Sequence, residues 1–288
     1  MKLAKDLITR VNTHMKLPDE FLKPIEVAYE KVLADDALID LCIECREVIC
    51  NEINPHNYGS VGNFPKLDEF DISFSDLFRA IILISNYDNL LALYKEKGIP
   101  ESQLSEILPD LAVAIGESTS LSGHVGLGGI RFGWMALHFT AQIFRIGRLQ
   151  YCYLPDYGLL DVHIPRDGKL VGCDESYEMA LEFYNKHFPD LPVIGFTCKS
   201  WLCDPTLKEV LPPTSNILTF QSRYITGKRE VFGSYSAVYE YVYDLNEKPE
   251  DLNTLPEDTS VRRAIKAFLL KGGNIHNTPG FIRVPFKY

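Results

Sequence analysis

The segment DVHIPRDGKLVGCDESYEMALEFYNKHFP, residues 161–189, places a histidine, cations and glycines where a predicted strand turns into a predicted helix. His163 lies near the end of that strand, and a histidine with an ordinary pKa of about 6.5 suits a general base. Asp161 lies on the same face of the strand, because alternate residues face the same way, and it is placed to orient the imidazole or simply to pair with it. A histidine satisfied by its neighbours in a sheet is the alternative interpretation.

The loop that follows this strand has the composition of an anion site. A helix N-terminus offers unpaired N–H groups and the positive end of the helix dipole, which suit a phosphate group. Arg166 and Lys169 add positive charge, and Gly168 permits close approach of the backbone. Asp167, Asp174 and Glu175 favour the alternative of an ordinary loop capped by Asp174, because they put negative charge where a phosphate would lie.

Two further motifs carry a weaker signal. The glycine-rich sequence GHVGLGG, residues 123–129, follows no predicted strand, so we interpret it as a flexible turn between domains and not as a phosphate loop. Cys42 and Cys45 are one helical turn apart. No second pair of ligands has zinc-binding spacing, so we predict buried thiols there and no metal site.

A cysteine nucleophile is another option for the chemistry. Cys198 or Cys203 would need a partner that stabilises the thiolate, and His163 is a candidate for that partner. The sequence contains no Gly-x-Ser-x-Gly, His-Glu-x-x-His or kinase motif.

The composition is that of a folded globular protein. Of the 288 residues, 46% are hydrophobic and 24% are charged, which is enough apolar material for two ordinary domains or one large one. The net charge of −10 argues against nonspecific binding to nucleic acid, which needs a basic surface. No apolar run approaches the ~20 residues of a membrane span, and the N-terminal residues lack a signal-peptide core. The seven cysteines lie mostly in apolar stretches, so we expect a cytoplasmic protein with reduced thiols and no membrane partner.

The elements that must position these residues fall into two groups. Apolar residues at helical spacing, together with capping signals, predict that the first group consists only of helices. They are expected over residues 19–33, from residues 35–36 onward, over 75–97 and over 101–116.

The second group alternates strands with helices, which predicts an α+β fold. We expect a domain boundary near residue 120, with an all-helical domain over 1–120 and a mixed domain over 121–288. The expected strands are 147–154, 159–165, 192–203, 216–224 and 236–244, and the expected helices are 133–146, 175–187, 205–211 and 260–270.

The expected strands have one aliphatic face and one polar face. His163, Gln221 and Arg223 would lie on the polar face, which is a candidate for one wall of a cleft beside the helical domain. A polar face that is simply exposed to solvent is an equal alternative. The tyrosines of the segment 235–243 are candidates for a pocket wall or for an interface between copies of the chain.

Four stretches in the second half of the chain resemble a known family: RIGRLQYCYL, DVHIPRDGKL, CKSWLCDPTLKEVLPPTSNILTFQSRY and TSVRRAIKAFLLKGG. They are similar to sequences of bacterial two-domain acyltransferases, which have a helical N-terminal domain and a C-terminal domain related to the GNAT superfamily of N-acetyltransferases. The resemblance implies a mixed, mostly antiparallel sheet flanked by helices. In that sheet, the strand within 192–203 would splay away from its neighbour and admit the pantetheine of coenzyme A.

The resemblance also implies roles for particular segments. Residues 166–174 would take the place of the pyrophosphate loop, although RDGKLVGCD departs from the superfamily's Arg/Gln-x-x-Gly-x-Gly/Ala spacing. The helix DPTLKEVL lacks the tyrosine that many members use to protonate the departing thiolate, and His163 stands nearest to the position of the common glutamate base. These departures favour the alternative that the protein binds an acyl-CoA without transferring its acyl group.

Together these inferences predict an acyl-CoA-dependent acyltransferase that moves a short acyl group, such as that of acetyl-CoA, directly to a small-molecule amine. His163 is the expected base, and Ser200, Trp201 and Arg223 are expected on the acceptor side. The alternatives are a noncatalytic acyl-CoA-binding or regulatory protein and the cysteine enzyme, and a homodimer is left open. Backbone N–H groups of one loop are expected to hold the pyrophosphate, namely those of Arg166, Asp167, Gly168, Lys169 and Leu170.

Overall fold

The computed structural model divides the chain into two compact units, Met1–Arg145 and Ile146–Tyr288. It describes residues 3–57, 64–65, 67, 69–228, 235–245 and 247–284. The boundary that we expected near residue 120 lies well before this division. The reason is that helix α8 (Gly129–Phe139) packs against α4 (Ile72–Ser85) and α7 (Asp110–Ser122), and so belongs to the first unit.

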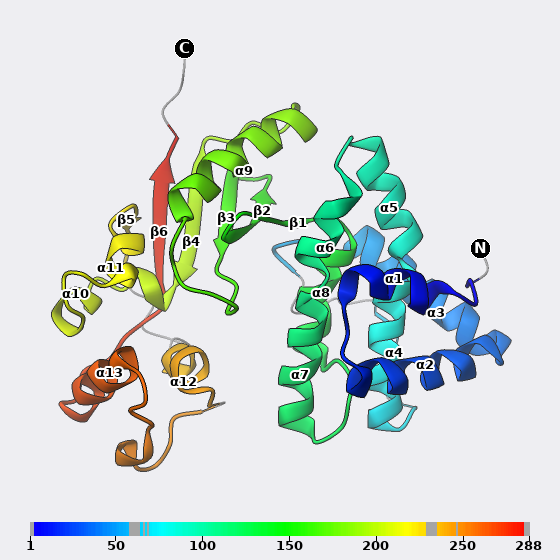
Figure 1. Ribbon diagram of the computed structural model, residues 1–288, viewed down its shortest axis with the longest axis horizontal. Helices are drawn as coiled ribbons and strands as arrows, with labels where there is room; N and C mark the ends of the chain where they lie inside the picture. Colours follow the sequence, from blue (N-terminus) through cyan, green and yellow to red (C-terminus); the bar gives the residue numbers. More distant parts are fainter. Residues whose placement is uncertain are drawn as a thin grey trace. The chain divides into compact units, whose positions relative to one another are not determined.

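The described residues of the first unit are almost entirely helical (Figure 1). The helix expected over 19–33 is confirmed, and Asp35 caps the next helix by accepting a hydrogen bond from the backbone N–H of Ala37 at 2.9 Å. The stretches 75–97 and 101–116, which we expected to be single helices, are each divided. Besides α4, α7 and α8, the helices are α1 (Leu7–Met15), α2 (Asp19–Leu33), α3 (Asp36–Glu52), α5 (Tyr87–Glu96), η1 (Glu101–Gln103) and α6 (Leu104–Ile107).

Helix α4 is the centre of this unit. It packs against α1, α2, α3 and α8, and its residues from Ala80 to Ser85 are all buried, which explains why its apolar residues run around the whole helix. The helix ends at Ser85, and the side-chain amide of the next residue, Asn86, donates a hydrogen bond to the carbonyl oxygen of Phe139 at 2.8 Å. In the described part of the chain, no helix has the length and apolar character that crossing a membrane requires.

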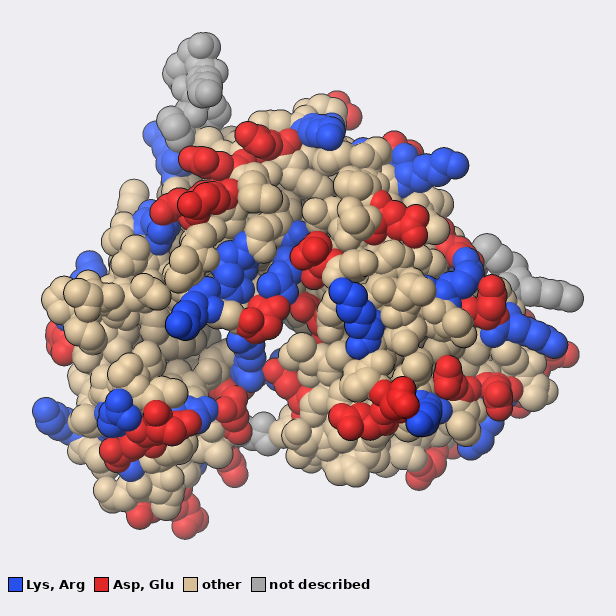
Figure 2. Space-filling view, viewed as in Figure 1, with Lys and Arg blue, Asp and Glu red and all other residues tan. Residues whose placement is uncertain are grey.

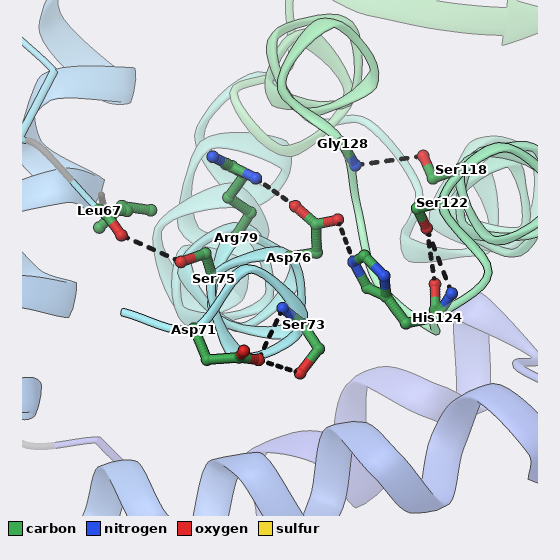
Figure 3. A network of polar contacts seen from close by, with 10 residues as sticks. All are labelled: Leu67, Asp71, Ser73, Ser75, Asp76, Arg79, Ser118, Ser122, His124 and Gly128. Atoms are coloured by element: carbon green, nitrogen blue, oxygen red, sulfur yellow. Dashed lines mark hydrogen bonds and ion pairs between the residues drawn. The ribbon is translucent and has the colours of Figure 1, made fainter. Parts of the chain in front are cut away.

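The glycine-rich segment 123–129 packs within the first unit, so its interpretation as a turn between domains is wrong. It connects α7 to α8, and His124 Nε2 lies 2.9 Å from Oδ2 of the buried Asp76 on α4 (Figure 3). Arg79 pairs with the other oxygen of the same carboxylate, and the backbone N–H of Leu127 donates to the carbonyl oxygen of Asp76 at 2.9 Å. The segment is therefore fastened to the central helix at two points, through His124 and Leu127.

The described residues form a mixed sheet with the strand order β1-β2-β3-β4-β6-β5; β1 crosses the division between the units, and the other strands belong to the second unit. The pairs β2–β3, β4–β6 and β5–β6 are antiparallel, and β3–β4 is parallel, so the expected α+β fold with a mostly antiparallel sheet is confirmed. The strands are β1 (Ile143–Ile146), β2 (Leu149–Leu154), β3 (Leu159–His163), β4 (Gly195–Ser200), β5 (Ile225–Thr226) and β6 (Thr278–Arg283).

Helix α9 (Cys173–His187) lies across one face of this sheet (Figure 1). An aromatic layer fills the space between them: Tyr177 of α9 stacks edge-on against Phe196 of β4, with 4.9 Å between ring centroids, and packs near Tyr151 of β2. The remaining helices are η2 (Trp201–Cys203), α10 (Leu207–Val210), α11 (Asn216–Gln221), α12 (Tyr235–Tyr243), η3 (Leu252–Thr254) and α13 (Ser260–Leu270).

Two expected strands are helices, and this is the main error of the sequence interpretation. Residues 216–221 form α11, and the ring of Tyr224, which follows the helix, lies 5.2 Å from the ring of Phe220, four residues earlier. Residues 235–243 form α12, where Tyr239 and Tyr243 are both buried. The apolar and aromatic residues of these segments fit both the alternation of a strand and the four-residue spacing of a helix. Packing in the folded unit favours the helix.

The other corrections concern boundaries. The helix expected over 133–146 ends at Phe139, and residues 143–146 form β1. Strand β6 was not expected, because Pro279 and Gly280 interrupt its apolar pattern. Acidic and basic side chains are interspersed over the described residues on the face drawn in Figure 2.

Substitution of Gly126 by alanine will destabilise the first unit. Gly126 has a φ of +152°, and a Cβ atom there would lie 2.5 Å from Cβ of Asp76. Overpacking of this kind costs about 1–3 kcal/mol, so we expect the melting temperature to fall by roughly 3–10 °C.

Gly129→Ala is the matched control for this experiment, because a Cβ atom at Gly129 meets no heavy atom within 4 Å. It should leave the melting temperature unchanged or raise it slightly. Equal melting temperatures for the two variants would contradict the packing of the glycine-rich segment against α4.

Candidate active site

Strand β3 presents an aliphatic face and a polar face, as its alternation predicted. Leu160 and Val162 are buried, whereas Asp161 and His163 lie on the opposite side. The Nε2 atom of His163 is 3.3 Å from Oδ2 of Asp161, and about a quarter of the histidine side chain, 27%, is exposed. The carboxylate therefore holds the imidazole in place while leaving it accessible.

The parallel strands β3 and β4 separate beside His163. Their pairing covers only residues 159–161 of β3 and 195–197 of β4. Beyond that point β3 continues with β2 as far as the pair His163–Gln150, and β4 continues with β6 as far as the pair Ser200–Thr278. Within the described residues, two adjacent strands thus part in the way that the resemblance implied. An extended ligand that carries amide groups can pair with such strand edges.

The loop between β3 and α9 is organised by Arg148, which lies in the turn between β1 and β2. Its guanidinium donates hydrogen bonds of 2.7 Å to three loop carbonyl oxygens, those of Pro165, Gly168 and Lys169. Sequence inspection missed this residue, because nothing in the turn sequence Gly147-Arg148 indicates contacts with a loop 17 to 21 residues away.

Both aspartates that argued against an anion site at this loop are paired with arginines. Asp167 lies 3.6 Å from the guanidinium of Arg148. Asp174, in the first turn of α9, receives a two-pronged ion pair from Arg223, with 2.6 Å between Nη2 and Oδ2. The hydrogen bonds from Arg223 lower the pKa of Asp174, so this carboxylate stays charged and balanced by its partner. These pairs reduce the negative charge that an incoming phosphate would meet.

Arg166 contacts helix α12. Its Nη2 donates to the carbonyl oxygen of Glu240 at 3.2 Å, its Nη1 lies 3.4 Å from Asp244, and its guanidinium carbon is 4.8 Å from the centre of the Tyr241 ring. Helix α12 therefore fastens the first residue of the loop. Lys169 and Gly168 are exposed at the middle of the loop, where we expected them to meet a ligand.

The three residues expected on the acceptor side are not on one surface of the sheet. Ser200 ends β4, and its Oγ accepts a hydrogen bond from the backbone N–H of Leu202 at 3.2 Å, which caps η2. Trp201 is buried in η2. Arg223 follows α11 and not a strand, and its ion pair with Asp174 places it at the start of α9, beside the loop. Gln221 is likewise in α11, so neither it nor Arg223 shares a strand face with His163.

The cysteines considered as nucleophiles are buried in the second unit. The neighbouring Cys203 thiol and burial raise the pKa of Cys198 well above its ordinary value, which disfavours the reactive thiolate. Cys42 and Cys45 are buried in α3, as expected, and burial raises the pKa of Cys42 to about 11. Cys50 is the exposed cysteine of the seven.

Two family models match the chain one after the other. An N-acyltransferase N-terminal domain matches residues 6–141, and a GNAT-like C-terminal domain matches residues 143–282. The parted parallel strands and the loop before α9 lie in the second of these regions. Fold and site thus define a GNAT-like acyltransferase architecture. The chain belongs to the two-domain GNAT-like acyltransferases, as the four sequence stretches implied.

Solved structures share the fold over almost the whole chain. A crystal structure of an acyltransferase in complex with CoA and 10C-teicoplanin is similar with a TM-score of 0.82 at 23% sequence identity, covering 96% of this chain and 88% of that one. A structure of an acyltransferase in complex with decanoyl-CoA is similar with a TM-score of 0.80 at 25% identity, covering 98% and 88%. No curated protein sequence matches the chain.

Alkylation of the folded protein will be confined to Cys50. The other six cysteines are buried, and burial also raises the pKa of Cys50, so labelling should be slow at neutral pH and faster as the pH rises. Mass spectrometry after treatment with iodoacetamide, before and after unfolding, measures this. A Cys50→Ser variant is the control and should take up no label while folded. Labelling of Cys198 or Cys203 in step with loss of activity would support the cysteine enzyme instead.

Proposed function

We propose that the protein is an acyl-CoA-dependent acyltransferase that transfers a short acyl group directly to an amine on a small molecule. The observation that carries the proposal is the parting of β3 and β4 beside the His163–Asp161 pair. This arrangement offers strand edges for the pantetheine arm next to a residue that can accept a proton.

The reaction needs positioning and one base. The amine nitrogen attacks the carbonyl carbon of the thioester, and a carbon–nitrogen bond forms. The carbon–sulfur bond then breaks, and its electron pair leaves with the sulfur of CoA. His163 accepts the proton that the amine nitrogen gives up, and solvent protonates the thiolate. Such direct transfer requires no covalent enzyme intermediate.

The loop before α9 is the proposed site for the pyrophosphate of CoA. Backbone N–H groups from Arg166 to Leu170 would donate to its oxygens, and Lys169 would add positive charge. Arg223, through its ion pair with Asp174, belongs to this end of the site in the proposal. Ser200 and Trp201, at the end of β4, remain the proposed residues of the acceptor side.

The solved structures support acyl-CoA as the donor and widen the choice of acyl chain. They include complexes with octanoyl-CoA, with decanoyl-CoA, and with decanoyl-CoA and teicoplanin. Our preference for a short acyl group is independent of those complexes. A donor series therefore has to run from acetyl-CoA to decanoyl-CoA.

A noncatalytic acyl-CoA-binding or regulatory protein is the second candidate. The contact of Arg166 with α12 favours this second candidate. The guanidinium of Arg166, which we expected near a phosphate, instead contacts the carbonyl oxygen of Glu240 and the carboxylate of Asp244. Binding without turnover is the result that distinguishes this candidate.

CoA will raise the melting temperature of the protein. A ligand that binds only the folded state stabilises it by about 2.7 kcal/mol at a concentration of 100 times its dissociation constant, which corresponds to several degrees. Scanning fluorimetry with CoA, acetyl-CoA and decanoyl-CoA measures the shift, and thiol release measures turnover with an amine panel. A shift with no turnover for any donor would favour the noncatalytic protein, and no shift at millimolar CoA would contradict both candidates.

Replacement of His163 by alanine will lower kcat/KM for acyl transfer by about 10²- to 10⁴-fold, the range typical of a general base. The shift in melting temperature caused by CoA should persist, because the imidazole is not needed for binding the nucleotide. His56→Ala is the control, since His56 is exposed in the first unit. Unchanged turnover in His163→Ala would rule out this base.

A further inference from the structure

The turn that carries Arg148 is fixed to the helix that the loop enters. The hydroxyl of Ser176, in α9, donates a hydrogen bond to the carbonyl oxygen of Ile146 and accepts one from the backbone N–H of Leu149 at 3.2 Å. Gly147 has a φ of +63°, and a Cβ atom there would lie 3.3 Å from Cβ of Ser176. The backbone on both sides of Arg148 is therefore packed tightly against Ser176, in the first turn of α9.

The guanidinium of Arg148 returns to the loop that precedes this same helix. Its Nη2 donates to the carbonyl oxygens of Pro165 and Gly168, and its Nε donates to that of Lys169, each at 2.7 Å. The side chain is only 10% exposed, so its charge is weakly screened by salt. One buried cation thus fixes three peptide groups within five residues of the loop.

The direction of these three peptide groups follows from covalent geometry. The described peptide bonds are trans, and in a trans peptide the N–H points opposite to the C=O of the same unit. The carbonyl groups of Pro165, Gly168 and Lys169 point to Arg148. The N–H groups that follow them, those of Arg166, Lys169 and Leu170, therefore point away from it.

We infer that Arg148 is the positioning residue that turns this loop into a cradle for pyrophosphate, and that it thereby selects a CoA thioester over an acyl-pantetheine. The inference rests on the proposed function. Of these three N–H groups, those of Lys169 and Leu170 are consecutive and both lie on the side away from Arg148. Consecutive N–H groups of this kind can form an anion-binding concavity, and the guanidinium adds positive charge behind it. Arg148 holds the loop by hydrogen bonds and acts on the ligand through it.

The role of Arg148 explains how a loop with the wrong glycine spacing can hold a phosphate. Glycine can adopt backbone conformations that turn N–H groups of a loop toward a ligand. Here the loop 166–174 has Gly168 and, at the start of α9, Gly172. A side chain from the neighbouring hairpin supplies the orientation of residues 165–170 through hydrogen bonds. The arginine, rather than the glycines, fixes the backbone.

The test compares two donors that carry the same acyl group, an acyl-CoA and the corresponding acyl-pantetheine, which has no pyrophosphate. In Arg148→Met we expect KM for acyl-CoA and the dissociation constant of CoA to rise by about 10- to 100-fold, the loss expected for charge-assisted hydrogen bonds. The kcat with acyl-CoA and the kcat/KM with acyl-pantetheine should stay within about threefold of the wild-type values. Calorimetry with CoA measures binding independently of turnover.

Arg263→Met is the matched control, because Arg263 is an exposed arginine of the same unit and its replacement removes the same charge. It should leave all of these constants unchanged. Equal CoA affinity in the wild-type protein and Arg148→Met would overturn the role of Arg148 and leave the proposed function standing. Equal losses with both donors would show that Arg148 serves folding alone and would also overturn it. A wild-type protein that does not bind CoA would overturn the proposed function and this inference together.

Discussion

The separation of β3 from β4 is the constraint on which the rest of the second unit depends. Two adjacent parallel strands would ordinarily continue their ladder, because unmade backbone hydrogen bonds are costly. Here the β3–β4 ladder covers only three residues of each strand, and beyond it each strand is held through its opposite edge, β3 by β2 and β4 by β6. The position of each strand beside His163 is therefore fixed by its neighbour on the outer side.

Near this separation, acidic and basic side chains are paired, although the chain as a whole is acidic. The protein carries a formal charge of −10, yet the aspartates around the loop before α9 are each matched with an arginine. Arg148 reaches Asp167 from the neighbouring hairpin, and Arg223 reaches Asp174 from beyond α11. A local anion site on an acidic protein needs pairing of this kind, because unbalanced carboxylates would repel the ligand at short range.

The sequence predicted those parts of the molecule whose signals are local. Helices α2, α3 and α13 follow from periodicity and caps, and the pair His163–Asp161 follows from alternation within one strand. Segments 216–224 and 235–243 could not be assigned this way, because residues two and four apart satisfy both a strand and a helix. The contacts of Arg148 and Arg223 span 17 to 49 residues, and only the folded chain brings those groups together.

The position of β6 has a consequence for how the protein is made. In the sheet order, β6 lies between β4 and β5, although it is formed by residues 278–283, which the ribosome adds after every other strand. Until β6 has been synthesised, the edge of β4 that pairs with β6 has no partner strand, and β5 has no neighbouring strand in the sheet. Long-range pairing of this kind folds slowly and exposes strand edges meanwhile. The second unit should consequently reach its final form only after translation has passed residue 283, whereas the helical unit can fold while the rest of the chain is still being synthesised.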